Sequence, residues 1–303
     1  KLEVRGEEIR ITDESGEKLL ANVNPLDYIS NILLTNTSPK IEGASRFTGG
    51  YLGYFSYDTV RYVEKTLVNI PEDDLKIPDI LLFKCTEIIA FDHLTHKLHI
   101  TINIPTKGDY EHNYKAGMER AGKILEEITR FSYVSREEKP AMEPVVKANI
   151  TKDEYIRNVQ KAKERIVEGD IFQVVLSNRF EVENPPEAFS IYRMLRSTNP
   201  SPYMYYLQTK DFAIAGASPE MLVNVENGRI TTKPIAGTIR RGKDLHEDKL
   251  LEAKLLGDEK ERAEHTMLVD LGRNDIGKVA SFGSVEVPQY MVIEKYSQLF
   301  HIT

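Results

Sequence analysis

The arrangement of strand-like runs most constrains the fold of this chain. Runs of β-prone residues at 203–208 and 212–217 follow one another closely, and residues 221–235 form a hairpin pattern that turns at Asn227-Gly228. Helical patterns lie between other strands. Strands that arrive mostly in hairpins, with helices interspersed, favour an α+β fold with antiparallel or mixed sheets over a doubly wound parallel sheet.

The N-terminal region, residues 1–131, is rich in strand patterns and contains two helical ones. Apolar residues alternate with polar ones in its strand-like runs and recur at helical spacing in the others. We expect strands within residues 2–11, 51–57 and 80–104, and helices over residues 27–34 and 114–131.

A segment of charges and two prolines, residues 132–148, interrupts these patterns, and we interpret it as a connecting segment rather than a domain boundary. The region that follows is residues 149–303. Thr151 and Glu154 form a capping-box pattern ahead of an apolar periodicity that Gly169 ends, which predicts a helix. We then expect a strand over residues 172–182 and a helix over residues 186–196.

Composition excludes several classes of function. With 303 residues and 41% hydrophobic side chains, the chain can bury a large core. The formal net charge of -7 gives no positive field for a nucleic acid or an anionic membrane surface. No apolar run approaches the roughly 20 residues of a membrane span, and the first residues do not resemble a signal peptide. We therefore expect a cytoplasmic protein without nucleic-acid or membrane partners.

Both ends of the chain suggest a segment of something longer. The chain begins at Lys1 without an initiator methionine. It stops at Thr303 inside an apolar-rich run, without a turn or polar tail.

The most informative stretch is the predicted helix over residues 259–277, EKERAEHTMLVDLGRNDIG. At about 100° per residue, one side of this helix forms an apolar arc. The arc consists of Ala263, Met267, Leu268 and Leu271. Glu264 falls inside the arc and Glu261 lies at its margin, so both carboxylates are expected to face the core.

An inward pair of carboxylates must be neutralised. Because Glu261 and Glu264 are three residues apart, they lie on one helix face, and a hard cation such as Mg²⁺ could bind them through oxygen. A salt bridge would also neutralise the pair. If the two glutamates instead lie on the solvated surface of the helix, they require no neutralising partner. The spacing alone leaves these alternatives open.

Three further segments carry candidate residues. Glu220 follows a probable strand, where it could face a cleft or simply end a turn. Residues 233–242, KPIAGTIRRG, are either a charged loop or a site in which Gly237 permits close approach to a ligand. Residues 171–179, IFQVVLSNR, form an apolar strand pattern interrupted at Gln173, which could otherwise be a buried amide with backbone partners.

The order of the motifs IFQVVLS, NPSPYMYYL, SPE, KPIAGT, EKERAEHTMLVDLGRND and EKYSQLFHI resembles that of the chorismate-utilising enzymes. This family includes anthranilate, aminodeoxychorismate, isochorismate and salicylate synthases. The resemblance runs through essentially the whole chain and is strongest over residues 151–302. It implies the anthranilate and aminodeoxychorismate synthase fold and a Mg²⁺ ion that the ring carboxylate of chorismate chelates.

The resemblance also implies roles for individual residues. Glu264 corresponds to a metal ligand, and Glu261 to a carboxylate of the metal shell that acts through water. Glu220 corresponds to the general acid that protonates the departing hydroxyl. His301 corresponds to the histidine that acts in pyruvate elimination. The substrate pocket would be lined by Ala236, Gly237 and Thr238.

Two positions favour the anthranilate type within this family. Enzymes of the group that add water resemble one another in placing a lysine base where this chain has Gln173, which can orient ammonia but cannot deprotonate water. Aminodeoxychorismate synthases typically carry lysine where this chain has Ala236. The resemblance therefore implies amination of chorismate at C2, loss of the C4 hydroxyl and elimination of pyruvate, as in the first step of tryptophan biosynthesis.

Partners and an effector follow from the same resemblance. A glutamine amidotransferase subunit would supply the ammonia, and L-tryptophan would inhibit. By itself the motif NPSPYMY is better explained as a turn leading into an aromatic strand, but the resemblance to the family favours part of the tryptophan pocket. The candidate effector residues are Asn199, Pro200, Ser201, Pro202, Tyr203 and Met204.

Two features of the family are not found in this sequence. These are the leucine-rich motif that completes the tryptophan pocket and the Gly-Thr-Val-Ser-Gly-Ala-Pro-Lys segment, whose region supplies further metal-binding glutamates. We therefore expect this segment to be inactive by itself. The alternatives are an aminodeoxychorismate synthase and a catalytically silent scaffold that binds tryptophan or a partner. Retention of Glu220, Glu261, Glu264 and His301 together favours an enzyme.

Overall fold

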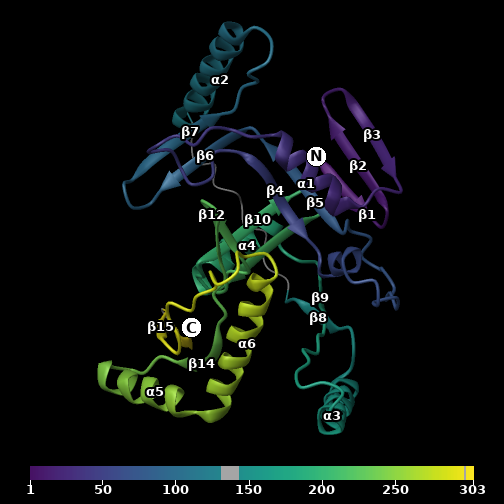
Figure 1. Cartoon of the computed structure of the whole chain (residues 1–303), viewed down its shortest axis with the longest axis vertical. Helices are drawn as coiled ribbons and strands as arrows, with labels where there is room; N and C mark the ends of the chain where they lie inside the picture. Colours follow the sequence, from purple (N-terminus) through teal and green to yellow (C-terminus); the bar gives the residue numbers. More distant parts are fainter. Residues whose placement is uncertain (131–142, 297) are drawn as a thin grey trace. The chain divides into compact units, whose positions relative to one another are not determined.

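The chain divides into two compact units, Lys1–Glu137 and Glu138–Thr303 (Figure 1). The division falls within residues 132–148, the segment that we interpreted as a connection. Residues 131–142 lie outside the described residues. The computed structural model describes residues 1–130, 143–296 and 298–303.

The first unit is built on a five-stranded antiparallel sheet with strand order β3-β2-β1-β5-β4. The strands are β1 (Leu2–Arg5), β2 (Glu8–Asp13), β3 (Gly16–Ala21), β4 (Gly50–Phe55) and β5 (Ile80–Cys85). The single alternating run expected over residues 2–11 is two strands, because Gly6 adopts a φ of 55° and reverses the chain between them. Helix α1 (Pro25–Thr35) adds Ile29 to the apolar core of this sheet.

The rest of the first unit is a hairpin and a long helix. Strands β6 (Glu87–Asp92) and β7 (Lys97–Ile102) pair antiparallel, and helix α2 (Tyr110–Arg130) packs on β7. A short 3-10 helix, η1, covers Tyr57–Tyr62. Both predicted helices of this region are therefore confirmed, with α2 starting four residues earlier than expected.

The second unit combines small antiparallel sheets with four helices among its described residues. Helix α3 (Lys152–Glu168) begins and ends as the sequence predicts: the Thr151 side chain accepts a hydrogen bond from the Glu154 amide, and Gly169 follows with a φ of 82°. The other helices are α4 (Ala188–Thr198), α5 (Leu245–Gly257) and α6 (Glu259–Gly277). The remaining strands are β8 (Val145–Ala148), β9 (Phe180–Glu183), β10 (Tyr203–Gln208), β11 (Ala213–Ser218), β12 (Asn224–Glu226), β13 (Arg229–Thr231), β14 (Ala236–Arg240), β15 (Ile293–Lys295) and β16 (Leu299–Ile302).

One strand prediction is wrong. Of residues 172–182, expected to form one strand, only those in β9 are paired, and their partner is β8, which lies inside the segment expected to be a connection. Within the described part of the chain no strand pairs with residues 171–179. A strand needs a neighbour for its backbone hydrogen bonds, so the β-prone sequence alone does not make it one.

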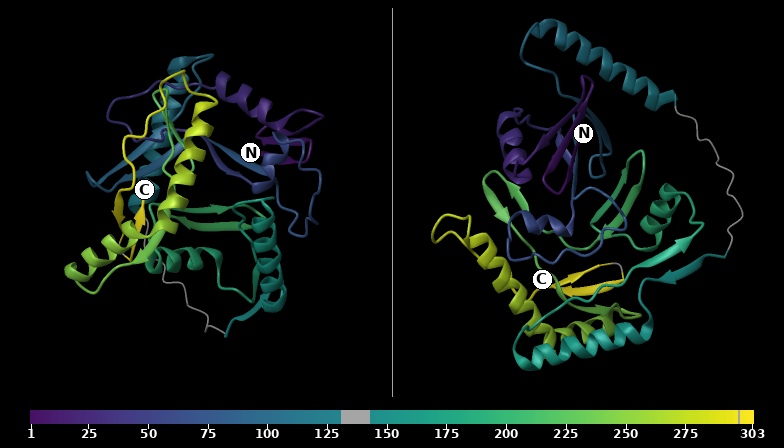
Figure 2. Two further views of the ribbon diagram at one scale, coloured as in Figure 1. Left: turned by 60° about the horizontal axis from the view of Figure 1, so that its bottom comes forward. Right: turned by 90° about the vertical axis from the view of Figure 1, so that its right-hand side faces the viewer.

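Strands β14, β16 and β15 form a three-stranded antiparallel sheet that carries most of the candidate site. Helices α5 and α6 meet end to end at Asp258, and this sheet lies in the angle between them (Figures 1 and 2). Leu255, Phe300 and Ile302 form the buried apolar cluster at this junction. No helix in the described residues is both long and apolar enough to cross a membrane.

Candidate active site

A β-bulge in β14 brings the strand close to Glu261 of α6, next to the pair that Thr238 forms with His301. Thr238 pairs with His301, but Ala236 pairs with Ile302, so Gly237 is an extra residue between two regular pairs. Gly237 is buried and adopts a φ of 73°. A Cβ atom there would lie 3.2 Å from Oε2 of Glu261 and 3.0 Å from Cδ1 of Ile302. Only glycine combines this backbone conformation with this closeness to α6.

His301 lies at the centre of the three-stranded sheet, and its side chain is buried, with 6% exposed. Its Nδ1 atom lies 2.9 Å from Oγ1 of Thr238, within hydrogen-bonding distance. Burial lowers the pKa of His301, and a hydrogen bond with the Gly237 backbone and the negative charges of Glu294 and Glu220 oppose this only in part. The imidazole is therefore neutral at neutral pH and able to accept a proton.

Glu294 stands opposite His301 in β15, and sequence analysis did not identify it. Lys233 donates a hydrogen bond from Nζ to Oε1 of Glu294, and Tyr296 donates from its hydroxyl to Oε2 at 3.0 Å. Burial opposes ionisation of Glu294, but these hydrogen bonds and the Lys233 charge outweigh it and lower the Glu294 pKa. Burial, followed by the bond to Glu294, raises the pKa of Tyr296 to about 12. The run EKYSQLFHI contains a hairpin pattern, and this pattern could have predicted that Glu294 pairs with His301.

Glu261 and Glu264 are both half-buried in α6, and Glu261 lies beside Gly237 of β14. Asp258 caps this helix, accepting hydrogen bonds from the amides of Lys260 and Glu261 at 3.0 and 3.1 Å. The expected inward orientation of the two glutamates is consistent with this burial. Neither glutamate side chain is therefore fully exposed to solvent.

The predicted apolar arc of α6 is partly wrong. Ala263 and Leu271 are exposed, and the buried face is centred on His265 instead. The reason is that the helix meets its neighbours at Glu261, beside Gly237, and at Gly272, where a Cβ would lie 3.1 Å from the Thr232 methyl. A helical wheel ranks residues by hydrophobicity and cannot show which face meets a partner.

His265 is fully buried, and neither ring nitrogen has a hydrogen-bond partner among the described residues. Its ring lies 5.6 Å from that of Tyr290. Burial lowers the pKa of His265. His265 is not among the residues predicted from the sequence, because histidine carries little hydrophobic signal.

The two helix glutamates fit a Mg²⁺ ion in their chemistry. Mg²⁺ is usually bound by one or two carboxylates, with water and substrate oxygens completing its octahedron. The absent side chain at Gly237 leaves space beside Oε2 of Glu261. Across the described residues no group of three or more histidine, cysteine, aspartate or glutamate side chains is arranged to hold a metal. The pair would therefore supply part of a coordination shell.

Glu220 is exposed just beyond β11, where its Oε1 accepts a hydrogen bond from the Ile235 amide at 3.0 Å. This bond ties Glu220 to the residue that precedes β14. Its negative charge also acts on His301. The structure therefore brings Glu220, Gly237, Thr238, Glu261 and His301 around one strand, with Ala236 buried beside them.

Gln173 is not brought into this group by any contact among the described residues. It is exposed and belongs to the irregular segment before β9. The candidate effector residues run from the end of α4 into the start of β10, with Asn199 ending the helix and Met204 paired with Ala217. Tyr203 pairs with Ser218, two residues before Glu220, so this segment is adjacent along the sheet to a candidate catalytic residue.

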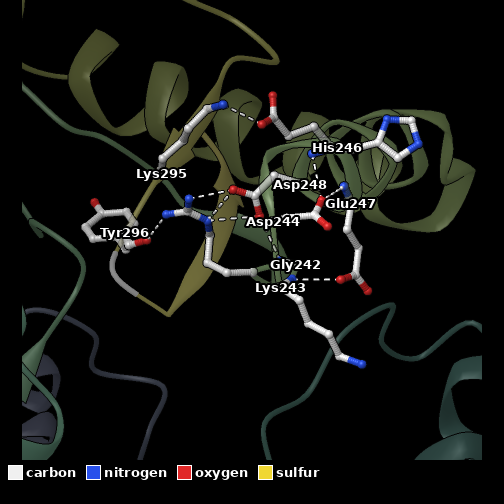
Figure 3. Close-up of polar contacts among 10 residues, drawn as sticks. Gly242, Lys243, Asp244, His246, Glu247, Asp248, Lys295 and Tyr296 are labelled. Atoms are coloured by element: carbon white, nitrogen blue, oxygen red, sulfur yellow. Dashed lines mark hydrogen bonds and ion pairs between the residues drawn. The ribbon is translucent and has the colours of Figure 1, made fainter.

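An ion pair with a buried carboxylate closes the far end of β14 (Figure 3). Asp248, with 4% exposed, accepts hydrogen bonds from Nη2 of Arg241 at 2.5 Å and from the Gly242 amide at 2.7 Å. Arg241 also donates from Nη1 to the Tyr296 carbonyl at 2.9 Å. The hydrogen bond from Arg241 is the main cause that lowers the pKa of Asp248. Together these interactions, which we call the Arg241–Asp248 clamp, fix the end of β14 to α5 and to the β15–β16 turn.

A cavity of about 660 Å³ lies beside the β12–β13 hairpin and the C-terminal half of α6. Met221, Lys233, Arg273 and Thr303 are among the residues that line it. None of the candidate catalytic or metal-binding residues does. The candidate site is therefore defined by side-chain contacts around β14, and this cavity lies next to it.

Comparison with known proteins agrees with the resemblance seen in the sequence. The family model described as chorismate binding enzyme matches residues 3–303. Anthranilate synthase component 1 of Acetivibrio thermocellus is 46% identical over 96% of this chain and 60% of its own length. The protein of the same name from Pseudomonas aeruginosa is 42% identical over 92% of this chain and 57% of its own length.

A solved structure, anthranilate synthase component I from Streptococcus pneumoniae TIGR4, superposes with a TM-score of 0.81 at 33% identity. The match covers 99% of this chain and 66% of that one. This chain thus spans about three fifths of the length of the curated relatives and two thirds of the solved one. The α+β fold predicted from the sequence is confirmed, and the chain belongs to the chorismate binding enzyme family.

Proposed function

We propose that the protein containing this chain is the synthase subunit of an anthranilate synthase. It would combine chorismate with ammonia at C2, expel the C4 hydroxyl and eliminate pyruvate to give anthranilate. The observation that carries the proposal is the bulge at Gly237, which places Glu261 and, through Thr238, His301 at one strand. The names and the high identity of the relatives support the same activity.

Glu261 and Glu264 would bind Mg²⁺, Glu264 directly and Glu261 directly or through water. When bound, the ion supplies positive charge that orients the substrate carboxylate and stabilises negative charge. Because Gly237 has no side chain, its backbone and the Glu261 carboxylate can approach the same ligand. Ala236 and Thr238 would complete this wall of the pocket.

Glu220 would donate the proton to the departing C4 hydroxyl. The Ile235 amide occupies Oε1, which leaves Oε2 as the carboxyl oxygen that could contact the hydroxyl. His301 would accept the proton that the ring loses when pyruvate leaves, a role that requires a neutral imidazole. The burial that lowers its pKa supplies this form.

The choice of ammonia and of C2 rests on two positions. Gln173 can orient a nucleophile through its amide but cannot deprotonate water, whereas ammonia already has a free lone pair. Ala236 is buried and offers no amine to the pocket. We further propose a glutamine amidotransferase partner, inhibition by L-tryptophan through residues 199–204 and a cytoplasmic location.

The test uses the complete subunit with chorismate, ammonium salt and Mg²⁺. We expect anthranilate, detected by its fluorescence, and no product when EDTA replaces Mg²⁺. Formation of the para isomer of aminobenzoate after addition of a lyase would select the aminodeoxychorismate alternative. If no aminated product forms, the remaining alternative is the catalytically silent scaffold.

A further inference from the structure

Three side chains form one row across the β14–β16–β15 sheet. Thr238 on one outer strand and Glu294 on the other both stand opposite His301 on the central strand. Directly opposite residues of antiparallel strands project from the same face and are close neighbours. His301 is therefore flanked on both sides by polar side chains that the backbone register fixes.

The carboxylate of Glu294 is held at both oxygens. Lys233 donates to Oε1, and the Tyr296 hydroxyl donates to Oε2 at 3.0 Å. Lys233 comes from the segment before β14, so the ion pair connects the two outer strands across His301. Because all three side chains are at most partly exposed, the arrangement is fixed more firmly than a surface pair.

Tyr296 transmits this constraint to the imidazole. Its ring packs edge-on against His301, with 5.3 Å between ring centres and 74° between planes. Two hydrogen bonds hold Tyr296: its hydroxyl donates to Glu294, and its backbone carbonyl accepts from Arg241 at 2.9 Å. Loss of the Glu294 carboxylate would free the hydroxyl end and allow the ring to move away from the imidazole.

We propose that Glu294 is a positioning residue for His301: it holds the Tyr296 ring against one side of the imidazole while Thr238 binds the other. The inference rests on the proposed function, in which His301 accepts a proton. It assigns to the Lys233–Glu294–Tyr296 group the task of keeping the imidazole aligned with the substrate. A small loss of alignment at a reacting group is costly in rate.

Charge supports the same assignment. The groups that act on His301 are the carboxylates of Glu294 and Glu220 and the Gly237 backbone, and all three raise its pKa against the larger effect of burial. Lys233 neutralises part of the Glu294 charge, and Tyr296 remains a neutral phenol with a pKa of about 12. Removal of the Glu294 charge should therefore lower the pKa of His301 further.

The test compares Glu294→Gln with Glu252→Gln in the complete subunit. Glu252 of α5 pairs with Lys295, the residue after Glu294, so the control removes an equal charge that lies against the same strand and makes no hydrogen bond or ion pair with His301 in the described part of the chain. In Glu294→Gln we expect the imidazole NMR titration of His301 to move to lower pH and kcat to fall by up to about 100-fold, with KM for chorismate little changed. In Glu252→Gln both should match the wild type.

A second variant covers the case in which Glu294→Gln fails to fold. Tyr296→Phe keeps the ring and removes only its bond to Glu294, and it should also lower kcat while leaving KM. The proposal is overturned if the His301 titration and kcat of the folded variants equal those of Glu252→Gln. The His301 titration needs no substrate, so it tests the role of Glu294 even if the enzyme assay fails. If the wild-type protein makes no anthranilate, the proposed function is refuted, but the titration can still show whether Glu294 acts on His301.

Discussion

Oε2 of Glu261 lies 3.2 Å from the point where a Cβ atom on Gly237 would stand. The two residues are 24 positions apart in the sequence and come from α6 and the bulge in β14. Any side chain at residue 237 must displace the glutamate, so the bulge and the proposed metal site are a single structural unit.

Replacement Gly237→Ala should therefore cost both stability and activity. The left-handed backbone alone costs about 1–2 kcal/mol for a residue with a Cβ atom, and the clash adds to it. Gly228→Ala is the matched control, because Gly228 has a similar φ of 77° and open space around it. Thermal unfolding and Mg²⁺ titration of both variants provide the measurement. Equal Tm values and equal Mg²⁺ affinities would contradict the close contact.

Glu264→Ala should abolish Mg²⁺-dependent turnover. Loss of a residue that merely supports a metal ligand costs about 10- to 100-fold, so loss of a ligand should cost roughly 100-fold or more. Glu259→Ala, exposed at the start of the same helix, is the control and should retain near wild-type activity. Activity assays over a range of Mg²⁺ concentrations test this. Mg²⁺-dependent turnover that persists in Glu264→Ala would refute the role of this residue.

His301→Met should slow pyruvate loss more than amination. Methionine fills the buried space but cannot accept a proton, so the aminated intermediate should accumulate. Chromatography of quenched reactions would detect it. If amination and pyruvate release slow to the same extent and no intermediate appears, the role of His301 in elimination is wrong.

The pH dependence of the elimination step should follow the neutral imidazole. Because burial lowers the pKa of His301 below its usual value of about 6.5, the residue stays competent as a base at and somewhat below that pH. The rate of pyruvate release should hold down to about pH 6.5 and fall only as the pH drops through the lowered pKa. A rate that halves well above pH 6.5 would show that burial does not control this group.

Asp248→Ala should destabilise the protein more than removal of an exposed partner. It removes the acceptor of Nε and Nη2 of Arg241 and of the Gly242 amide, whereas Asp270→Ala breaks only an exposed pair with Arg273 at 3.4 Å. Thermal unfolding should show a clearly larger fall in Tm for Asp248→Ala. The pKa of Asp248 is lowered, so its contribution is complete above about pH 3.8 and is lost as the pH falls below that value. Equal Tm values in the two variants would contradict a structural role for the clamp.

Local chemistry made much of the fold predictable. The limits of α3 follow from Thr151 and Gly169, and the β12–β13 hairpin turns at Asn227-Gly228 as expected. Helix α6 spans residues 259–277, the range that the sequence predicts. In each case the signal and the structure lie within a few residues of each other, so no distant partner can override it.

Features that depend on distant partners were not predictable in the same way. The segment around Gln173 has the composition of a strand, but pairing decides whether it becomes one. The buried face of α6 follows its contacts with Gly237 and Thr232, so His265 is buried although a wheel plot gives it no prominence. Glu294 gains its place beside His301 only through strand register.

The extra residue in β14 has a consequence for how this strand can vary. Deletion of Gly237 would leave the Ala236–Ile302 and Thr238–His301 pairs adjacent in an unbroken ladder and remove the bend beside Glu261. Deletion of a paired residue of β14 would shift the register by one and turn the side chains on one side of the deletion to the opposite face of the sheet. Insertions and deletions between Pro234 and Arg241 should therefore be tolerated far less well than substitutions that respect volume. The number of residues in this strand is therefore constrained more strictly than their identity.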